Sequence, residues 1–299
     1  MNETNYGFSF NDITIKDNCF NKTYKNIVGK NKINNEIYFY LYIIKNNIKF
    51  PIPELITYGD GFLSLQYISN STTITNIINE SNIYDYINKI MFYLQTIHSI
   101  KKEVYVSVIQ KDVLIETEKK VLDRFKEYNW EKNELINSIK SVNHVKIKNI
   151  FYYCDIIKTK IINLLKDRNE YNFIHGDIHL GNILLDENNH FYFIDPRGYF
   201  GESKLFGLCE YDYAKLLFGL SGYSVFDNMM IREIVIINNN IEIDFIKNYE
   251  FIFESGRFDE ITILLCLSIW LGNNSCFSNI NKKITSLMIA YYYCEKYLC

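Results

Sequence analysis

The chain has 299 residues, of which 48% are hydrophobic and 22% are charged, and its formal net charge is −3. This length allows a substantial buried core in one or two domains. The charge excludes the basic surface of a typical nucleic-acid-binding protein, so we expect no nucleic-acid partner. The longest apolar run, Ile261–Leu271, is too short to span a bilayer, so we expect no membrane association.

Two further features favour a cytoplasmic location. The N-terminus has neither the basic start nor the apolar core of a signal peptide. The seven cysteines are scattered and none forms a Cys-x-x-Cys pair, which argues against a disulfide framework and against a zinc site. We therefore expect a cytoplasmic protein with reduced thiols.

The first seventy residues combine short strands with one helix. Apolar and polar residues alternate between turn residues, and the predicted strands or strand ends are Phe8–Phe10, Ile13–Ile15, Phe20–Val28, Leu55–Tyr58 and Phe62–Tyr67. The first hairpin is expected to turn at Asn11-Asp12 and the last at Gly59-Asp60-Gly61. The apolar spacing becomes helical over residues 33–45, and Pro51 ends that helix.

Beyond residue 73 the apolar spacing is mostly helical. The clearest predicted helices are Ile83–Ile100, Val113–Tyr128, Ile150–Leu165 and Tyr211–Ser221. A strand-rich beginning followed by a helix-rich remainder predicts an α+β protein.

The segment over residues 173–197 carries the residue types that phosphoryl transfer needs. Asp177 and Asn182 are five residues apart on a predicted tight loop, and Asp195 follows the short apolar strand Phe191–Ile194. A kinase uses one Asp to accept the proton of the attacking hydroxyl, and an Asn and a second Asp to hold magnesium beside the nucleotide phosphates. All three residues occur here in that order, which predicts a kinase active site.

The segment His175–Asn182, followed by Ile194-Asp195, resembles the catalytic motif of the aminoglycoside phosphotransferase and choline kinase family, which shares the protein-kinase-like fold. Protein kinases have Arg where this chain has Gly176, and Asp-Phe-Gly where it has Asp195-Pro196-Arg197. Both differences are typical of small-molecule kinases, and the Asp-Pro pair is also similar to fructosamine kinases.

The resemblance implies a two-lobed protein-kinase-like fold. Residues 1–69 would form a small, β-rich N-lobe that binds the nucleotide, and residues 70–299 a larger, mostly helical C-lobe. It also implies Mg²⁺-dependent transfer of the γ-phosphoryl group of ATP or GTP to a hydroxyl of a small metabolite, such as a sugar, amino sugar or amino alcohol. Two alternatives stay open: a pseudokinase-like module that binds nucleotide with little or no turnover, and a protein kinase.

The motif residues have separate expected roles. Asp177 is the expected catalytic base, which orients the acceptor hydroxyl and takes its proton. Asn182 and Asp195 are the expected Mg²⁺ ligands, because magnesium prefers oxygen donors.

The nucleotide phosphates also need a cation, and that cation needs a carboxylate. Glu36 lies on the first predicted helix, where kinases place this carboxylate. Lys22 is the expected cation, with Lys25 and Lys30 as alternatives.

The rest of the nucleotide is expected to lie at the end of the N-lobe. Adenine would hydrogen-bond to the hinge backbone near Gln66 and Ile68. The N-terminus has no Gly-x-Gly-x-x-Gly sequence, so the turn at Asn11-Asp12 is expected to cover the phosphates.

Three further residues near the motif are candidates for structural or binding roles. The resembling families use the first His of the motif to support the loop by hydrogen bonds, which implies a structural role for His175. His179 either approaches the phosphates or the substrate, or stays structural. Arg197 either contacts an anionic group or forms an ion pair with Glu202 or Glu210.

Acidic residues outside the motif complete the candidates. Asp212 is expected to cap its helix and brace the catalytic loop. Four acids, Glu250, Glu254, Asp259 and Glu260, lie where aminoglycoside kinases hold cationic substrates, or else they form a solvated helix face.

Overall fold

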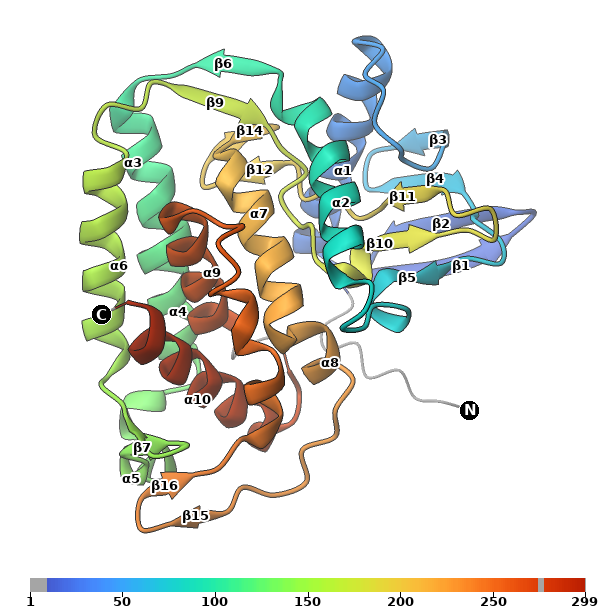
Figure 1. The fold of residues 1–299 in the computed structure, drawn as a ribbon. Helices are drawn as coiled ribbons and strands as arrows, with labels where there is room; N and C mark the ends of the chain where they lie inside the picture. The colour runs from blue at the N-terminus through green and yellow to red at the C-terminus, as the bar shows by residue number, and fades with distance from the viewer. Residues whose placement is uncertain (1–9, 274–276, 299) are drawn as a thin grey trace. The chain divides into compact units, whose positions relative to one another are not determined.

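The computed structural model of the chain describes residues 10–273 and 277–298, and these residues fall into two compact units (Figure 1). The first, here called the motif unit, comprises residues 10–104 and 170–216. The second, here called the helical unit, comprises the described residues of 105–169 and 217–298. The mixture of helices and strands confirms the predicted α+β class, while the lobe boundary after residue 69 stays a prediction.

The motif unit contains a four-stranded antiparallel sheet with the order β1-β2-β4-β3. Its strands are β1 (Asn11–Lys16), β2 (Cys19–Tyr24), β3 (Leu55–Gly59) and β4 (Phe62–Gln66). The predicted turn between β3 and β4 is confirmed, since Gly59 pairs with Phe62. The predicted turn at Asn11-Asp12 is wrong, because both residues lie in β1 and the chain turns at Asp17-Asn18, whose φ angles are +52° and +58°. The predicted strand Phe8–Phe10 falls mostly outside the described residues.

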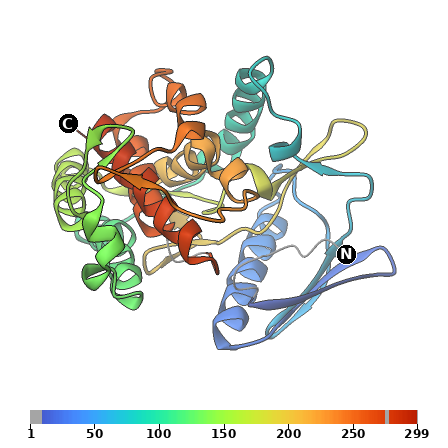
Figure 2. The same ribbon diagram turned by 90° about the horizontal axis from the view of Figure 1, so that it is seen from below.

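Helix α1 (Ile27–Lys45) packs against one face of this sheet (Figure 2). It begins earlier than predicted, because the side chain of Asn26 accepts a hydrogen bond from Gly29 N at 2.9 Å and caps the helix. The prediction of a strand as far as Val28 is therefore wrong at its end. Burial of apolar side chains joins helix and sheet, and this core consists of Ile33, Ile37, Tyr40, Leu63 and Leu65.

The remaining elements of the motif unit surround the sequence motif. They are β5 (Thr72–Thr73), η1 (Ile74–Asn76), α2 (Ile83–His98), β6 (Lys101–Glu103), β9 (Glu170–Phe173), η4 (Leu180–Asn182), β10 (Ile183–Leu185), β11 (Phe191–Phe193), β12 (Tyr199–Phe200), β13 (Ser203–Lys204), β14 (Phe206–Gly207) and most of α7 (Cys209–Phe218). These strands form the small sheets β11-β10-β5, β14-β9-β6 and β12-β13. The predicted strand before Asp195 is thus confirmed as β11, one strand of a tight hairpin.

The helical unit consists of packed helices and one small sheet. Its longer helices are α3 (Val106–Leu114), α4 (Lys120–Glu127), α6 (Ile150–Leu164), α9 (Glu260–Gly272) and α10 (Ile280–Tyr297). The shorter elements are η2 (Ile115–Lys119), η3 (Trp130–Lys132), α5 (Glu134–Ser138), η5 (Gly219–Tyr223), α8 (Ser224–Phe226), η6 (Asp244–Asn248) and η7 (Glu250–Ile252), with the sheet β15-β16-β7-β8 formed by Ile236–Ile237, Asn240–Ile241, Ser141–Val142 and Val145–Lys146.

Helix α9 lies at the centre of this unit, in contact with α4, α6 and α10 (Figure 1). Its side chains are apolar on all sides, which explains why it is mostly buried. The predicted helix over Val113–Tyr128 is wrong at its start, because the helical segment begins at Val106 and continues through the π-helical turn η2. Among residues 10–273 and 277–298, no helix is both long and apolar enough to cross a membrane.

Candidate active site

Asp212 of α7 accepts hydrogen bonds from the loop between β9 and η4, residues 174–179. Asp212 Oδ2 accepts a hydrogen bond from His175 N at 3.0 Å, and its Oδ1 accepts one from Gly176 N at 2.6 Å. His98, at the end of α2, lies with Nε2 2.9 Å from the same carboxylate. Asp212 is fully buried, so these bonds fix the loop strongly. The bracing role predicted for Asp212 is consistent with this geometry, but α7 begins at Cys209, so Asp212 does not cap it.

Gly176 allows the loop to turn sharply beside the chain that follows Asp195. Its φ angle is +85°, in the left-handed region that favours glycine. A Cβ atom at this position would also lie 3.1 Å from the Cβ atom of Arg197 and 3.3 Å from the carbonyl oxygen of Tyr199. The glycine is therefore required by the local backbone, which explains why Arg does not stand here.

His175 is completely buried beneath the loop and packs edge-on against Phe39 of α1. Its Nδ1 accepts a hydrogen bond from Asp177 N at 3.3 Å, and its carbonyl oxygen accepts one from Arg197 N at 2.8 Å. Burial lowers the pKa of His175 to about 4, against the negative charges of Asp212 and Asp177, which act to raise it. The imidazole is therefore neutral at pH 7, and its position fits the structural role expected for it.

The carboxylate of Asp177 points to a lysine of α7. Lys215 Nζ lies 2.9 Å from Asp177 Oδ1, and the two side chains are 16% and 32% exposed. Burial acts to raise the pKa of Asp177, but the charge and hydrogen bond of Lys215, with the electrostatic influence of His179 and Arg197, outweigh it and hold that pKa well below its usual range. Asp177 is thus ionised at neutral pH, as an acceptor of a hydroxyl proton must be.

Asn182 links the loop to the strand that leads to Asp195. Its side-chain Nδ2 donates a hydrogen bond to the backbone carbonyl oxygen of Asp177 at 3.0 Å, and its own backbone carbonyl oxygen accepts one from Ile194 N at 3.0 Å. Asp195 follows directly and adopts a left-handed backbone, with φ of +56°, which is uncommon for a residue with a side chain. The loop and the hairpin therefore present Asn182 and Asp195 in a fixed relation.

These two residues suit a magnesium ion. The side-chain oxygen of Asn182 accepts no hydrogen bond from any described residue, because the amide nitrogen is the atom that bonds to Asp177. The Asp195 side chain is 46% exposed. Within residues 10–273 and 277–298, no three His, Cys, Asp or Glu side chains are grouped to hold a metal. Both candidate ligands offer oxygens, which Mg²⁺ prefers, and a bound Mg²⁺ would complete its coordination with waters and nucleotide phosphates.

Lys22 lies between two carboxylates. Its Nζ is 3.0 Å from Glu36 Oε2 and 3.1 Å from Glu36 Oε1, and it also forms an ion pair with Asp195. The Lys22 and Glu36 side chains are only 6% and 7% exposed. Burial raises the pKa of Glu36, although the ammonium of Lys22 opposes this. The structure therefore brings together Lys22 of β2, Glu36 of α1 and the aspartate that follows β11.

The alternative lysines have other partners. Lys25 Nζ lies 3.1 Å from Asp12, and Lys30 Nζ lies 2.6 Å from Asp60. The aspartate of each pair is exposed, and neither lysine is bonded to Glu36. Of the three candidates, Lys22 is the one that meets the predicted carboxylate.

The predicted hinge lies at the end of β4. Gln66 N already donates a hydrogen bond to Glu54 O at 2.8 Å. The backbone N–H of Ile68 donates to no residue in the described part of the chain, and the Ile68 carbonyl oxygen accepts a hydrogen bond from Ser71 Oγ at 2.8 Å. Ile68 is thus better suited than Gln66 to donate to an adenine nitrogen, although the role of both stays a prediction.

Arg197 and His179 are both fixed by local contacts. Arg197 Nη1 donates a hydrogen bond to the Tyr211 hydroxyl at 2.5 Å, and the guanidinium lies 3.8 Å from the centre of the Tyr199 ring. His179 Nδ1 accepts a hydrogen bond from Gly181 N at 3.2 Å and caps the short helix η4. Arg197 and His179 both lie close enough to Asp177 to lower the pKa of its carboxyl group.

The four acids near the C-terminus belong to the helical unit. Asp259 caps α9, since its Oδ1 accepts a hydrogen bond from Thr262 N at 2.7 Å. Glu250 Oε2 accepts a hydrogen bond from the Tyr292 hydroxyl at 2.8 Å. Glu260 Oε1 lies 4.0 Å from Lys160 Nζ, and Glu254 is exposed. Asp259 and Glu250 therefore stabilise the helical unit.

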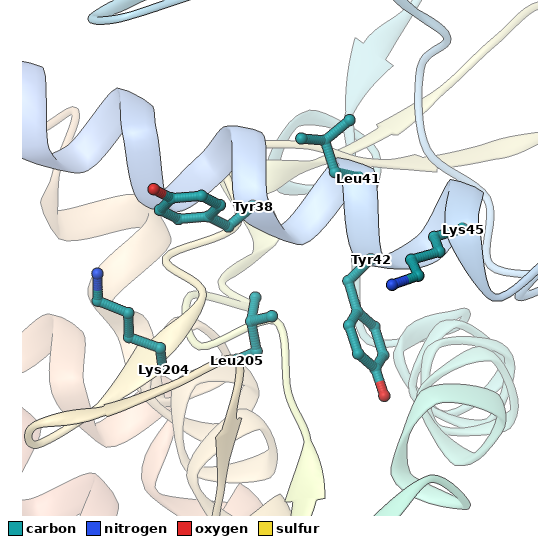
Figure 3. A pocket seen from close by; sticks show the side chains of 6 residues that line it. All are labelled: Tyr38, Leu41, Tyr42, Lys45, Lys204 and Leu205. Atoms are coloured by element: carbon teal, nitrogen blue, oxygen red, sulfur yellow. The ribbon is translucent and has the colours of Figure 1, made fainter.

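A separate cavity of about 380 Å³ lies beside α1 (Figure 3). By helical spacing, its α1 residues lie on the side of the helix opposite Glu36. Six side chains line it: Tyr38, Leu41, Tyr42, Lys45, Lys204 and Leu205. None of the predicted site residues is among them. This cavity is therefore not the site that the sequence predicts.

Two residues of the site were not predicted. His98 and Lys215 contact Asp212 and Asp177 from α2 and α7. The signal for Lys215 was its position three residues after Asp212, which places both on one side of a helix. The sequence offers no such signal for His98, because its partner is 114 residues away.

Comparison with known proteins finds similarity in structure but not in sequence. No family model matches the sequence, and no curated protein matches it. Among solved structures, the ADP-bound aminoglycoside phosphotransferase APH(2″)-Ib is similar, with a TM-score of 0.53 and 14% identity over 96% of this chain and 91% of that one. Choline kinase LicA from Streptococcus pneumoniae has a TM-score of 0.51 and 14% identity, over 96% of this chain and 90% of that one. A glucosamine kinase has a TM-score of 0.51 and 10% identity, over 93% of this chain and 72% of that one.

These similarities define the class of the fold, which is protein-kinase-like. More narrowly, the fold is the form found in aminoglycoside phosphotransferases and choline kinases. The predicted resemblance is therefore confirmed at the level of the fold.

Proposed function

We propose that this protein is a small-molecule kinase, which transfers the γ-phosphoryl group of ATP or GTP to a hydroxyl of a small metabolite. The observation that carries this proposal is the meeting of Lys22 with both Glu36 and Asp195 in the unit that also presents Asp177 and Asn182. These five residues come from four separate stretches of the sequence. Their order and their contacts both match the parts that kinase chemistry requires.

In the proposed reaction the acceptor oxygen attacks the γ-phosphorus while its proton passes to the carboxylate of Asp177. The bond from the γ-phosphorus to the bridging oxygen breaks, and the nucleoside diphosphate leaves with that electron pair. Since the pKa of Asp177 is low, its main contribution is to orient the hydroxyl, and the proton is transferred late.

The remaining residues would hold the nucleotide. Lys22 would bind the phosphates while Glu36 fixes its ammonium. Asn182 and Asp195 would hold Mg²⁺, which supplies positive charge beside the phosphates when bound. The N–H group of Ile68 would donate to the base.

A small acceptor is supported by two observations. The structures of similar fold include kinases named for choline and glucosamine, and a complex of APH(2″)-IIa with gentamicin. In addition, only a short segment separates Asp195 from α7, and β12, β13 and β14 occupy it. A protein kinase uses a longer segment here to bind a peptide, so sugars, amino sugars and amino alcohols are the better candidates.

The proposal is tested by incubating the purified protein with ATP or GTP, Mg²⁺ and a panel of sugars, amino sugars and amino alcohols. We expect one acceptor class to give a phosphorylated product by mass spectrometry and an equal amount of nucleoside diphosphate. Tight nucleotide binding without transfer to any acceptor would instead indicate the pseudokinase-like alternative.

A further inference from the structure

The cavity beside α1 lies within the motif unit but contains none of the residues proposed for phosphoryl transfer (Figure 3). Four of its lining residues, from Tyr38 to Lys45, recur on α1 at helical spacing and so lie on one side of that helix. The other two, Lys204 of β13 and the adjacent Leu205, belong to the segment that follows Asp195. The volume of about 380 Å³ falls within the range of pockets that bind small molecules, about 300 to 1,000 Å³.

One wall of this cavity is held in an uncommon backbone conformation. The φ angle of Leu205 is +63°, a left-handed value that is sterically costly for leucine. Two backbone hydrogen bonds fix it: Leu205 N donates to Gly198 O at 2.7 Å, and Leu205 O accepts from Ile174 N at 3.0 Å. Backbone strain of this kind is concentrated at active sites and ligand-binding sites. The wall is therefore placed by the fold at a conformational cost, which favours a binding role for the cavity.

The two lysines of the cavity carry charges that no described carboxylate neutralises. Within residues 10–273 and 277–298, neither Lys45 nor Lys204 forms an ion pair. The Lys204 ammonium lies 5.3 Å from the centre of the Tyr38 ring, which attracts a cation without cancelling its charge. Lys45 lies in the last turn of α1, where the helix dipole favours a cation, and its ammonium donates to no described residue. Figure 3 shows the two lysines on opposite sides of Leu205.

This lining suits a flat apolar group that carries an anion. Tyr38 is 50% exposed and offers the face of its ring, while Leu41 and Leu205 supply apolar contacts. An anionic group can accept hydrogen bonds from the Lys45 ammonium, which has three donor hydrogens. A cationic ligand would be repelled by both lysines.

The shape of the surface argues against a protein as the occupant. A stable protein interface buries about 800 Å² on each partner. Among the residues that line the cavity, only Tyr38 is a large hydrophobic side chain with a high exposure, whereas Leu41, Tyr42 and Leu205 are partly buried. The apolar contacts are thus inside the cavity, where a small molecule can reach them.

We propose that this cavity is a second small-molecule site, which binds an aromatic compound bearing a carboxylate or phosphate group. The ring lies against Tyr38, Leu41 and Leu205, and the anionic group binds Lys45. Lys204 contributes a weaker attraction, because its ammonium is already held over Tyr38. The inference does not rest on the proposed kinase function, since no residue of the cavity takes part in that reaction.

The test uses four naphthalene compounds that share one ring system and differ in charge: 2-naphthoate, 2-naphthyl phosphate, 2-naphthamide and 2-(aminomethyl)naphthalene. Binding to the full chain is measured by calorimetry with Mg²⁺, both with and without a saturating non-hydrolysable ATP analogue. We expect at least one of the two anions to bind about tenfold or more tightly than the amide and the amine, with the ATP analogue present. The carboxylate and the phosphate distinguish the two sources of charge.

Variants assign the binding to the cavity. Lys45→Met should remove most of the preference for the anion, and Lys204→Met should reduce it less. Leu205→Gly should weaken the binding of all four compounds, because an apolar wall is lost while glycine accepts the left-handed backbone. Lys49→Met is the matched control, since Lys49 is an exposed lysine that follows α1 and does not line the cavity. The melting temperature shows whether each variant is folded.

Several outcomes would overturn the inference: equal binding of the four compounds, tightest binding of the amine, no binding of either anion, or a preference that Lys45→Met leaves unchanged. Binding that occurs only without the ATP analogue would also overturn it, because the compound would then occupy the nucleotide site. Sedimentation that shows a dimer dissociated by Tyr38→Ala would identify this face as an interface between two copies instead. Phosphoryl transfer is not measured in any of these experiments, so the kinase proposal stands or fails separately.

Discussion

Two clusters of charged side chains lie in the motif unit, and each pairs a lysine with an aspartate. In the first, Lys22 lies between Glu36 and Asp195, so carboxylates are in excess. In the second, Asp177 is paired one to one with Lys215, whose Nζ lies 2.9 Å from Asp177 Oδ1. The extra carboxylate of the first cluster suits the proposed metal–nucleotide, whereas the second would meet the acceptor hydroxyl through Asp177.

The comparison is tested most strongly by removing the carboxylate of the second cluster. Asp177→Ala should lower the rate of phosphoryl transfer at least ~100-fold, because the acceptor loses its proton acceptor and its orientation. The nucleotide affinity should stay nearly unchanged, since the phosphates are bound at the other cluster. Steady-state kinetics with the acceptor and calorimetry with the ATP analogue measure the two effects, and near-normal turnover would show that Asp177 is a turn residue only.

The lysine of the first cluster should affect the nucleotide instead. Lys22→Met should raise the KM for nucleotide about tenfold or more, because a charge-assisted bond to the phosphates is lost. Lys25→Met is the matched control and should change the KM little, since Lys25 is paired with Asp12 on the surface.

Stability must be checked alongside this pair of variants. Lys22→Met leaves Glu36 buried without a cation, which is itself destabilising. A variant with both Lys22→Met and Glu36→Gln removes that charge and should still bind nucleotide weakly. If instead Lys25→Met had the larger effect on KM, the assignment of the phosphate-binding lysine would be wrong.

The two metal ligands proposed for the first cluster should differ in strength. Asp195→Asn should raise the Mg²⁺ concentration needed for half-maximal activity roughly tenfold or more. Asn182→Ala should raise it less, because a neutral oxygen binds the cation more weakly than a charged one. A Mg²⁺ titration of both variants decides the order, and unchanged metal dependence of Asp195→Asn would remove Asp195 from the site.

The two clusters also differ in how far the sequence predicts them. Asp177 and Asn182 lie on one short loop and Asp195 directly follows the adjacent hairpin, so their spacing alone places them together. Lys22 and Glu36 were predicted from the resemblance, and the ion pair between them agrees with it. Lys215 was missed, because its contact with Asp177 depends on the direction in which α7 passes the loop, and tertiary packing decides that direction.

Competing local preferences, for strand, helix cap and turn, explain where the predicted fold differs from the structure. The predicted strand ran to Val28 because Ile27 and Val28 are β-branched and follow a real strand. The cap formed by Asn26 outweighs this preference, and both residues are exposed in the first turn of α1. The sequence offers two similar turn pairs, Asn11-Asp12 and Asp17-Asn18, and the chain turns at the second, where both residues adopt the left-handed backbone that Asn and Asp tolerate.

The last expected effect is on stability and concerns His175, the buried histidine beneath the loop that carries Asp177. Burial lowers the pKa of His175 to about 4, whereas an unfolded chain has an ordinary histidine pKa near 6.5. Between these values the unfolded state binds the proton and the folded state does not, so the free energy of unfolding falls as the pH falls from about 6.5 to about 4. The loss from this group should approach about 3 kcal/mol at the lower end.

His175→Asn tests this, because Asn Oδ1 can accept the hydrogen bond from Asp177 N that His175 Nδ1 accepts. The variant should be less stable at pH 7, since the cavity beside Phe39 is not filled. Its stability should nevertheless depend less on pH between 6.5 and 4.5 than that of the wild type, as measured by urea unfolding at several pH values. His190→Asn is the control, because His190 is an exposed histidine of the same unit. Equal pH dependence in the wild type and His175→Asn would mean that His175 binds its proton over the same pH range in the folded and unfolded protein, and the pKa assigned to the buried imidazole would then be wrong.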